Sequence, residues 1–128
     1  MSKEQQFNQM IDGKEAHYSK KGFMSKCKKV GGKLGTKGLE SAATLFVALK
    51  SPNMSRSNKL VIAGALGYFI LPIDLVADLL PVVGLSDDLF VITMALSKVY
   101  LAITDDMKQE AHGLVTSKFG RFVHQDEQ

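Results

Sequence analysis

The sequence predicts an all-α fold, a single small helical domain of about five helices with a central helical hairpin that contains Pro and Asp residues. Apolar residues recur at three- and four-residue intervals along most of the 128-residue chain, which is the period of an amphipathic helix. No segment of useful length shows the apolar–polar alternation of a half-buried strand. A hydrophobic content of 45% with 23% charged residues is typical of a globular protein and is sufficient for one core.

The N-terminal third is expected to be a basic, partly helical arm. It is polar from Ser2 to about Lys20. An apolar helix face then follows at positions i, i+4, i+7 and i+11, formed by Phe23, Cys27, Val30 and Leu34. Four glycines between residues 31 and 38 weaken this segment, because each costs up to about 1 kcal/mol of helix stability relative to alanine. We therefore expect residues 1–39 to form the arm and residues 40–128 to form the helical domain.

The predicted domain begins with a short apolar helix over residues 40–50, which Pro52 and a cluster of Ser and Asn residues end. Ser55 or Ser57 is a suitable N-cap for the next helix. That helix ends at Leu71, because Pro72 removes a backbone donor and disfavours helical geometry at the residue before it.

The second half of the domain repeats this pattern of breaks and caps. Residues 73–80 can form a helix of about two turns, and Pro81 and Gly84 then break the chain. Ser86 fits as the N-cap of a helix that runs to about Ile103. Thr104 or Asp105 would cap a last helix over residues 105–123. The helices over 57–71 and 86–103 are expected to pack together as the central hairpin.

The charge is unevenly divided along the chain. Residues 1–50 hold ten lysines and four acidic residues, a balance of +6, whereas residues 51–128 hold six basic and nine acidic residues, a balance of −3. A basic amphipathic segment is typical of proteins at anionic membrane surfaces. The candidate membrane- or anion-binding residues are Lys20, Lys21, Lys26, Lys28, Lys29, Lys33 and Lys37. Binding of nucleic acid is disfavoured, since only Tyr18 and Phe23 are available to stack on bases.

The longest uncharged run, residues 60–73, has fourteen residues and ends at Asp74. A membrane span needs about 20 apolar residues, so a buried core helix is favoured over two conventional spans. Ala63 and Gly67 have the four-residue spacing that permits close helix contact, in membranes and in soluble proteins alike. The N-terminal residues resemble no secretory signal, and a single cysteine implies no oxidising compartment. We therefore expect a cytoplasmic protein that associates with a membrane peripherally.

The stretch YFILPIDLVADLLPVVGLSDDLFVI, residues 68–92, resembles the signature of the YkvA-like family, a helical domain of unknown function that is spread through bacteria. The matching residues are Tyr68, Pro72, Ile73, Asp74, Leu75, Asp78, Pro81, Gly84, Asp87 and Asp88. Ala77 stands where the family usually has proline. The resemblance covers about residues 45–101. It implies a helical domain, often described as membrane-associated, with no established activity or active site.

Four carboxylates lie within this apolar stretch, and they are the candidate metal ligands: Asp74, Asp78, Asp87 and Asp88. The first two share a face if residues 73–80 are helical, and the other two begin the following helix, so the pairs could converge. Oxygen ligands suit Mg²⁺ or Ca²⁺. The favoured interpretation is structural, with the aspartates as helix caps and as acceptors for backbone N–H groups. A catalytic carboxylate pair is a third alternative.

Taken together, these features favour a non-enzymatic helical module at the cytoplasmic face of a membrane, with an anionic lipid surface, a second copy or another protein as its partner. The alternatives are a soluble metal-binding or hydrolytic domain that uses the four aspartates, and a protein–protein adaptor. Cys27 is expected to be a small apolar contact, although neighbouring lysines favour a lowered thiol pKa. Tyr68 is expected to be a core aromatic whose hydroxyl meets an aspartate.

Overall fold

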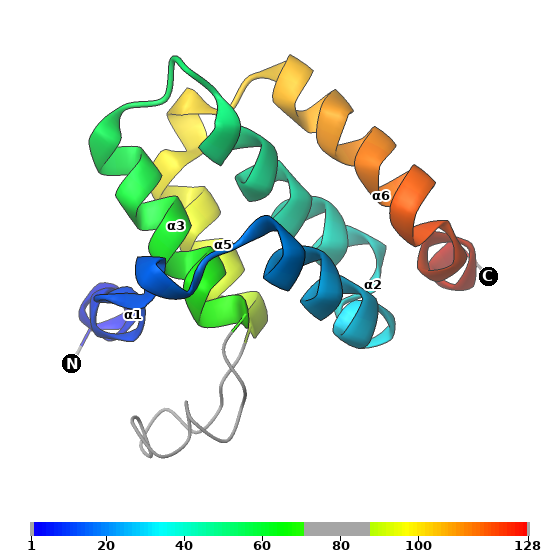
Figure 1. The fold of residues 1–128 in the computed structure, drawn as a ribbon, viewed down its shortest axis with the longest axis horizontal. Helices are drawn as coiled ribbons and strands as arrows, with labels where there is room; N and C mark the ends of the chain where they lie inside the picture. The colour runs from blue at the N-terminus through cyan, green and yellow to red at the C-terminus, as the bar shows by residue number, and fades with distance from the viewer. Residues whose placement is uncertain (1, 71–87, 128) are drawn as a thin grey trace.

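The computed structural model describes residues 2–70 and 88–127, with all their side chains except those of Lys33, Asp88 and residues 119–127 (Figure 1). This part of the chain contains helices and no strand, which confirms the predicted all-α class. The elements in chain order are α1 (Lys3–Ile11), η1 (Lys14–His17), α2 (Lys20–Lys50), α3 (Arg56–Ile70), α5 (Asp88–Val99), η2 (Tyr100–Ala102) and α6 (Asp105–Glu127), where η denotes a 3₁₀ helix.

Short hydroxyl side chains begin four of these helices. At α1, α2, α3 and α6 the hydroxyl of Ser2, Ser19, Ser55 or Thr104 accepts a hydrogen bond from the backbone N–H three residues later. Such caps satisfy backbone donors that a helix leaves without partners at its N-terminus. Ser55 and Thr104 are thus the caps among the predicted alternatives, whereas Ser86 lies outside the described residues.

Helix α2 contains a sharp reversal at Gly35. The backbone there has φ of 75° and ψ of 177°, a conformation that is essentially restricted to glycine. The halves before and after this residue lie side by side in Figure 1. The ring of Phe23, in the first half, stacks on that of Phe46, in the second, with centroids 4.7 Å apart. Helix α2 therefore has two arms joined by this turn. The first arm contains the helical face predicted over residues 23–34, and the second contains the helix predicted over residues 40–50.

One core joins the two arms of α2 to the other helices. Phe23 also contacts Phe69 of α3, with a centroid distance of 6.0 Å. The largest fully buried side chains are Phe7, Met10, Phe23, Leu39, Leu45, Phe46, Ile62, Leu66, Tyr68, Phe69 and Ile92. The predicted division between residues 39 and 40 falls within α2, and residues on both sides of it contribute to this core.

Two glycines of α3 allow the N-terminal segment to lie directly on that helix. A Cβ atom at Gly67 would lie 1.8 Å from the carbonyl oxygen of Lys14, and one at Gly64 would lie 2.9 Å from that of Ile11. Real Cβ atoms do not approach so closely, because packed interiors leave no such overlap. The small residues in this apolar helix thus accommodate the backbone of η1 and the end of α1.

The predicted partners of the central hairpin, α3 and α5, pack against each other (Figure 1). Helix α3 is shifted by one residue from the predicted range, and α5 ends in the 3₁₀ turn η2 instead of continuing to Ile103. Helix α6 packs mainly along α2. The two-turn helix predicted over residues 73–80 lies outside the described residues.

The turn in α2 can be tested by replacing Gly35 with alanine. We expect the free energy of unfolding to fall by about 1–3 kcal/mol, the cost of holding a residue with a Cβ in this region of φ and ψ. Urea unfolding followed by circular dichroism measures the change.

The matched control for this prediction is Gly32→Ala. Gly32 is exposed on the first arm of α2, and an added Cβ there meets no atom within 4 Å. Alanine should therefore stabilise the protein, by roughly 0.5–1 kcal/mol. A stabilising effect at Gly35 as well would contradict the turn.

Candidate anion-binding site

The first arm of α2 turns its apolar side to the core and its lysines to solvent. Phe23 and Cys27 are 0% and 1% exposed, since they repeat every four residues along the buried face. The exposed lysines of α2 before residue 40 are Lys20, Lys21, Lys28 and Lys29 on the first arm and Lys37 at the start of the second arm. We refer to these five residues as the lysine surface.

Within the described part of the chain, no carboxylate forms an ion pair with a residue of the lysine surface. No acidic residue occurs between positions 16 and 39 of the sequence. Glu40, the next one along the chain, contacts His112 of α6. Exposed positive charges without a neighbouring carboxylate create a field that attracts anions.

Two glutamates elsewhere in the described part of the chain pair with lysines outside this surface. The ammonium of Lys98 donates to Glu4 at 2.8 Å, and this hydrogen bond lowers the pKa of the Glu4 carboxyl. Lys50 lies 3.6 Å from Glu110. The five residues of the lysine surface have no such ion pair among the described residues.

The remaining two predicted lysines are not included in the lysine surface. Lys26 is half-buried, with its ammonium 5.2 Å from the ring centroid of Phe69, a distance that gives a cation–π attraction. Lys33 lies on α2, and its side chain is outside what the structure describes. Five of the seven predicted residues are thus exposed and available to an anion.

A groove lies between the two arms of α2 and helix α6. Its volume is about 270 Å³. The residues that line it are Lys20, Met24, Lys28, Phe46, Lys50, Leu114 and Lys118. Sequence reasoning did not include Lys50 and Lys118, because they join Lys20 and Lys28 only through the reversal at Gly35 and the packing of α6. The one sequence feature that could have indicated the reversal was the glycine-rich centre of α2.

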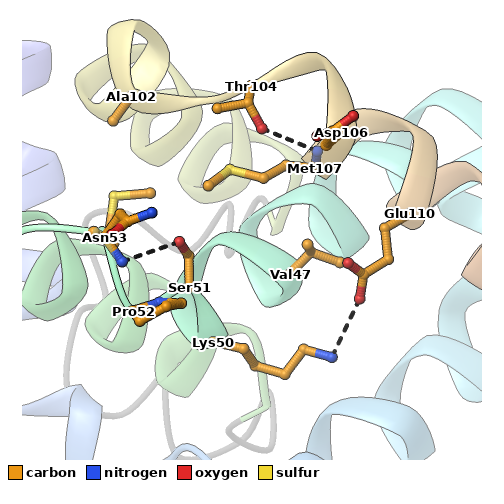
Figure 2. A pocket seen from close by; sticks show the side chains of 11 residues that line it. Val47, Lys50, Ser51, Pro52, Asn53, Ala102, Thr104, Asp106, Met107 and Glu110 are labelled. Atoms are coloured by element: carbon orange, nitrogen blue, oxygen red, sulfur yellow. Dashed lines mark hydrogen bonds and ion pairs between the residues drawn. The ribbon is translucent and has the colours of Figure 1, made fainter.

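A larger cavity, of about 560 Å³, lies where α2 ends and α6 begins (Figure 2). Lys50 reaches across one side of it to Glu110, and the hydroxyls of Ser51 and Thr104 accept hydrogen bonds from nearby backbone N–H groups. These polar groups are thus engaged in local turns and one ion pair. The cavity wall provides neither histidine nor cysteine, so it offers no nucleophile paired with an imidazole base.

The predicted metal ligands cannot be placed. Asp74, Asp78 and Asp87 lie outside the described residues, and Asp88 begins α5 with its side chain undescribed. Elsewhere in the described part of the chain, no three His, Cys, Asp or Glu side chains lie together as a metal site would require. A site for Mg²⁺ or Ca²⁺ at the four aspartates remains a prediction.

Two other residues singled out in the sequence are core residues. Burial raises the pKa of the Cys27 thiol to about 12, and this effect outweighs the opposite influence of Lys26. Cys27 is thus the apolar contact that the helix pattern predicts, without the lowered pKa that the neighbouring lysines favour. Tyr68 is 1% exposed and is a core aromatic, as predicted. Its expected aspartate partners fall mainly in the undescribed segment.

Comparison with known proteins gives one finding. A family model with the description "Protein of unknown function (DUF1232)" matches residues 58–94. The chain is therefore similar, over most of α3 and the start of α5, to a domain family of unknown function. The match supports the expected similarity to a domain family of unknown function, but it does not support the YkvA-like name. No curated protein and no solved structure matches the chain.

Among residues 2–70 and 88–127, no helix combines the length and the apolar character that crossing a bilayer requires.

The burial of Cys27 predicts its reactivity. The thiolate is the form that attacks a disulfide reagent, and it is scarce at pH 8 when the pKa is about 12. We expect the native protein to react with a disulfide reagent far more slowly than the urea-unfolded protein at the same pH. Absorbance of the released thiol measures both rates, and equal rates would contradict the burial of Cys27.

Proposed function

We propose that the protein is a non-enzymatic helical module that binds anionic lipid surfaces reversibly through the lysine surface of α2. The observation that carries this proposal is the set of exposed lysines with no carboxylate partner among the described residues. Near an anionic membrane each lysine contributes about 1 kcal/mol. Several lysines together are sufficient for binding without a membrane span.

The burial of the apolar face of α2 supports a peripheral mode of binding. Phe23, Cys27 and Phe46 lie in the core, so these side chains are not available to enter the bilayer as those of an interfacial amphipathic helix do. Binding would then depend on charge, and salt would weaken it by screening.

Lipid is a better-supported anionic partner than single-stranded nucleic acid. Stable binding of unpaired bases uses exposed aromatic rings as stacking platforms. Phe23 is 0% exposed, and Tyr18 is half-buried, which raises the pKa of its hydroxyl. The lysine surface therefore lacks the aromatic component of such a site.

The location belongs to the same proposal. The cytoplasmic leaflet is the one that carries a negative surface potential, and the YkvA-like resemblance implies membrane association. A protein that attaches to that leaflet from the cytoplasm satisfies both considerations. A metal-binding or hydrolytic role for the four aspartates, and an adaptor role towards another protein, are the rival hypotheses.

Co-sedimentation with lipid vesicles tests the proposal. The wild-type protein should bind vesicles that contain phosphatidylglycerol, should not bind pure phosphatidylcholine vesicles, and should dissociate at high salt. Replacing Lys21, Lys29 and Lys37 together by glutamine should weaken binding by about a hundredfold, because three lysines contribute about 3 kcal/mol.

The charge-matched control replaces Lys3, Arg56 and Lys59 by glutamine. These residues lie on α1 and α3, whereas the lysine surface lies on α2, and the change in net charge is the same. We expect the control to retain most of the binding. Equal losses in both triple variants, or wild-type protein that ignores anionic vesicles, would refute the lysine surface as the binding site.

A further inference from the structure

The groove between α2 and α6 combines lysines with apolar side chains. Lys20, Met24 and Lys28 follow one another at four-residue intervals and so lie on one side of the first arm. The second arm contributes Phe46 and Lys50 to the same groove. Two faces of a single helix are thereby turned towards each other across the Gly35 reversal.

The floor of the groove is apolar. Phe46 is 2% exposed, while Met24 and Leu114 are half-buried at its sides. The thioether chain of methionine adapts readily to the shape of a ligand. A hydrocarbon chain laid on these three side chains would lose contact with water, which stabilises the bound state in proportion to the apolar area covered.

Around this floor stand four ammonium groups, with one carboxylate close to them. Lys50 is held near Glu110 at 3.6 Å and over the ring of Phe46 at 4.8 Å. Lys20, Lys28 and Lys118 have no carboxylate partner within the described part of the chain. The groove therefore carries an excess of positive charge directly beside an apolar surface.

We propose that this groove binds one free anionic amphiphile, a straight-chain carboxylate of the fatty-acid type, with its chain on the floor and its head among the lysines. Lysine donates hydrogen bonds and accepts none, so a head group with acceptors alone is complementary to it. A peptide would bring amide N–H donors into a groove whose floor side chains provide no strong acceptor. This binding goes beyond attachment to a lipid surface and does not depend on it.

Isothermal titration calorimetry with decanoate, kept below its micelle concentration and without vesicles, tests the proposal. We expect saturable binding of one decanoate per protein. Decanol, which keeps the chain without the charge, and acetate, which keeps the charge with almost no chain, should each bind at least about tenfold more weakly, a factor that corresponds to about 1.4 kcal/mol.

Variants of the two parts of the groove sharpen the test. Lys20→Gln with Lys28→Gln removes two ammonium groups, and Leu114→Gln makes the floor polar. Each change should weaken decanoate binding by at least about tenfold. Met24→Gln provides a second floor variant should Leu114→Gln fail to fold, as circular dichroism would show. The control, Lys3→Gln with Arg56→Gln, changes the net charge by the same amount at residues that do not line the groove. It should bind decanoate as the wild type does.

The outcomes separate this proposal from the proposed function. Equal binding of acetate and decanoate, or unchanged decanoate binding in both groove variants, would overturn the amphiphile site. Binding of decanoate only in the presence of vesicles would also overturn the amphiphile site, because the protein would then be binding the membrane and not free decanoate. Failure of the vesicle experiment alone would leave the decanoate result intact.

Discussion

The reversal of α2 at Gly35 is the constraint on which the other helices depend. At about 1.5 Å per residue a straight helix of this length would extend for roughly 47 Å, and its two ends could not share a core. The turn instead stacks the ring of Phe23 on that of Phe46, and the ring of Phe69 of α3 also packs against Phe23. Helices α3 and α6 then cover the paired arms. A single backbone conformation available to glycine thus determines where the large aromatic side chains meet.

The same reversal determines which lysines are exposed and which of them lie close together. Packing the apolar face of the first arm inward leaves its lysines in solvent, and the sequence supplies no acidic residue between positions 16 and 39 to compensate them. The second arm and α6 then add Lys50 and Lys118 beside Lys20 and Lys28. Like charges so arranged repel one another and disfavour the compact state. A bound anion relieves this repulsion, and because it binds the folded protein it also stabilises the fold. This is why both proposed activities, at a lipid surface and in the groove, require an anionic partner.

Sequence reasoning was most successful where the signal is local. The burial of Phe23 and Cys27 follows from four-residue spacing, and the cap at Thr104 follows from a hydroxyl that precedes a helical pattern.

The sequence could not predict features that depend on residues distant along the chain. Four glycines in one segment lower helix propensity equally, so the pattern did not show that Gly35 alone would leave the helical region. Gly67 is required because the backbone of Lys14 lies against it. The pKa of Cys27 depends on whether burial or the nearby lysines dominate, and only the three-dimensional packing decides that.

The contact between Phe23 and Phe46 is the most direct test of this account. Nuclear Overhauser effects between the two rings can be measured in protein labelled with ¹³C at phenylalanine, with Phe46→Leu used to assign the signals. The account predicts strong cross-peaks, because the ring centroids lie 4.7 Å apart. An uninterrupted helix would place the two residues roughly 35 Å apart. Absence of these cross-peaks in the folded protein, together with helical chemical shifts at Gly35, would contradict the turn and with it the groove that the turn creates.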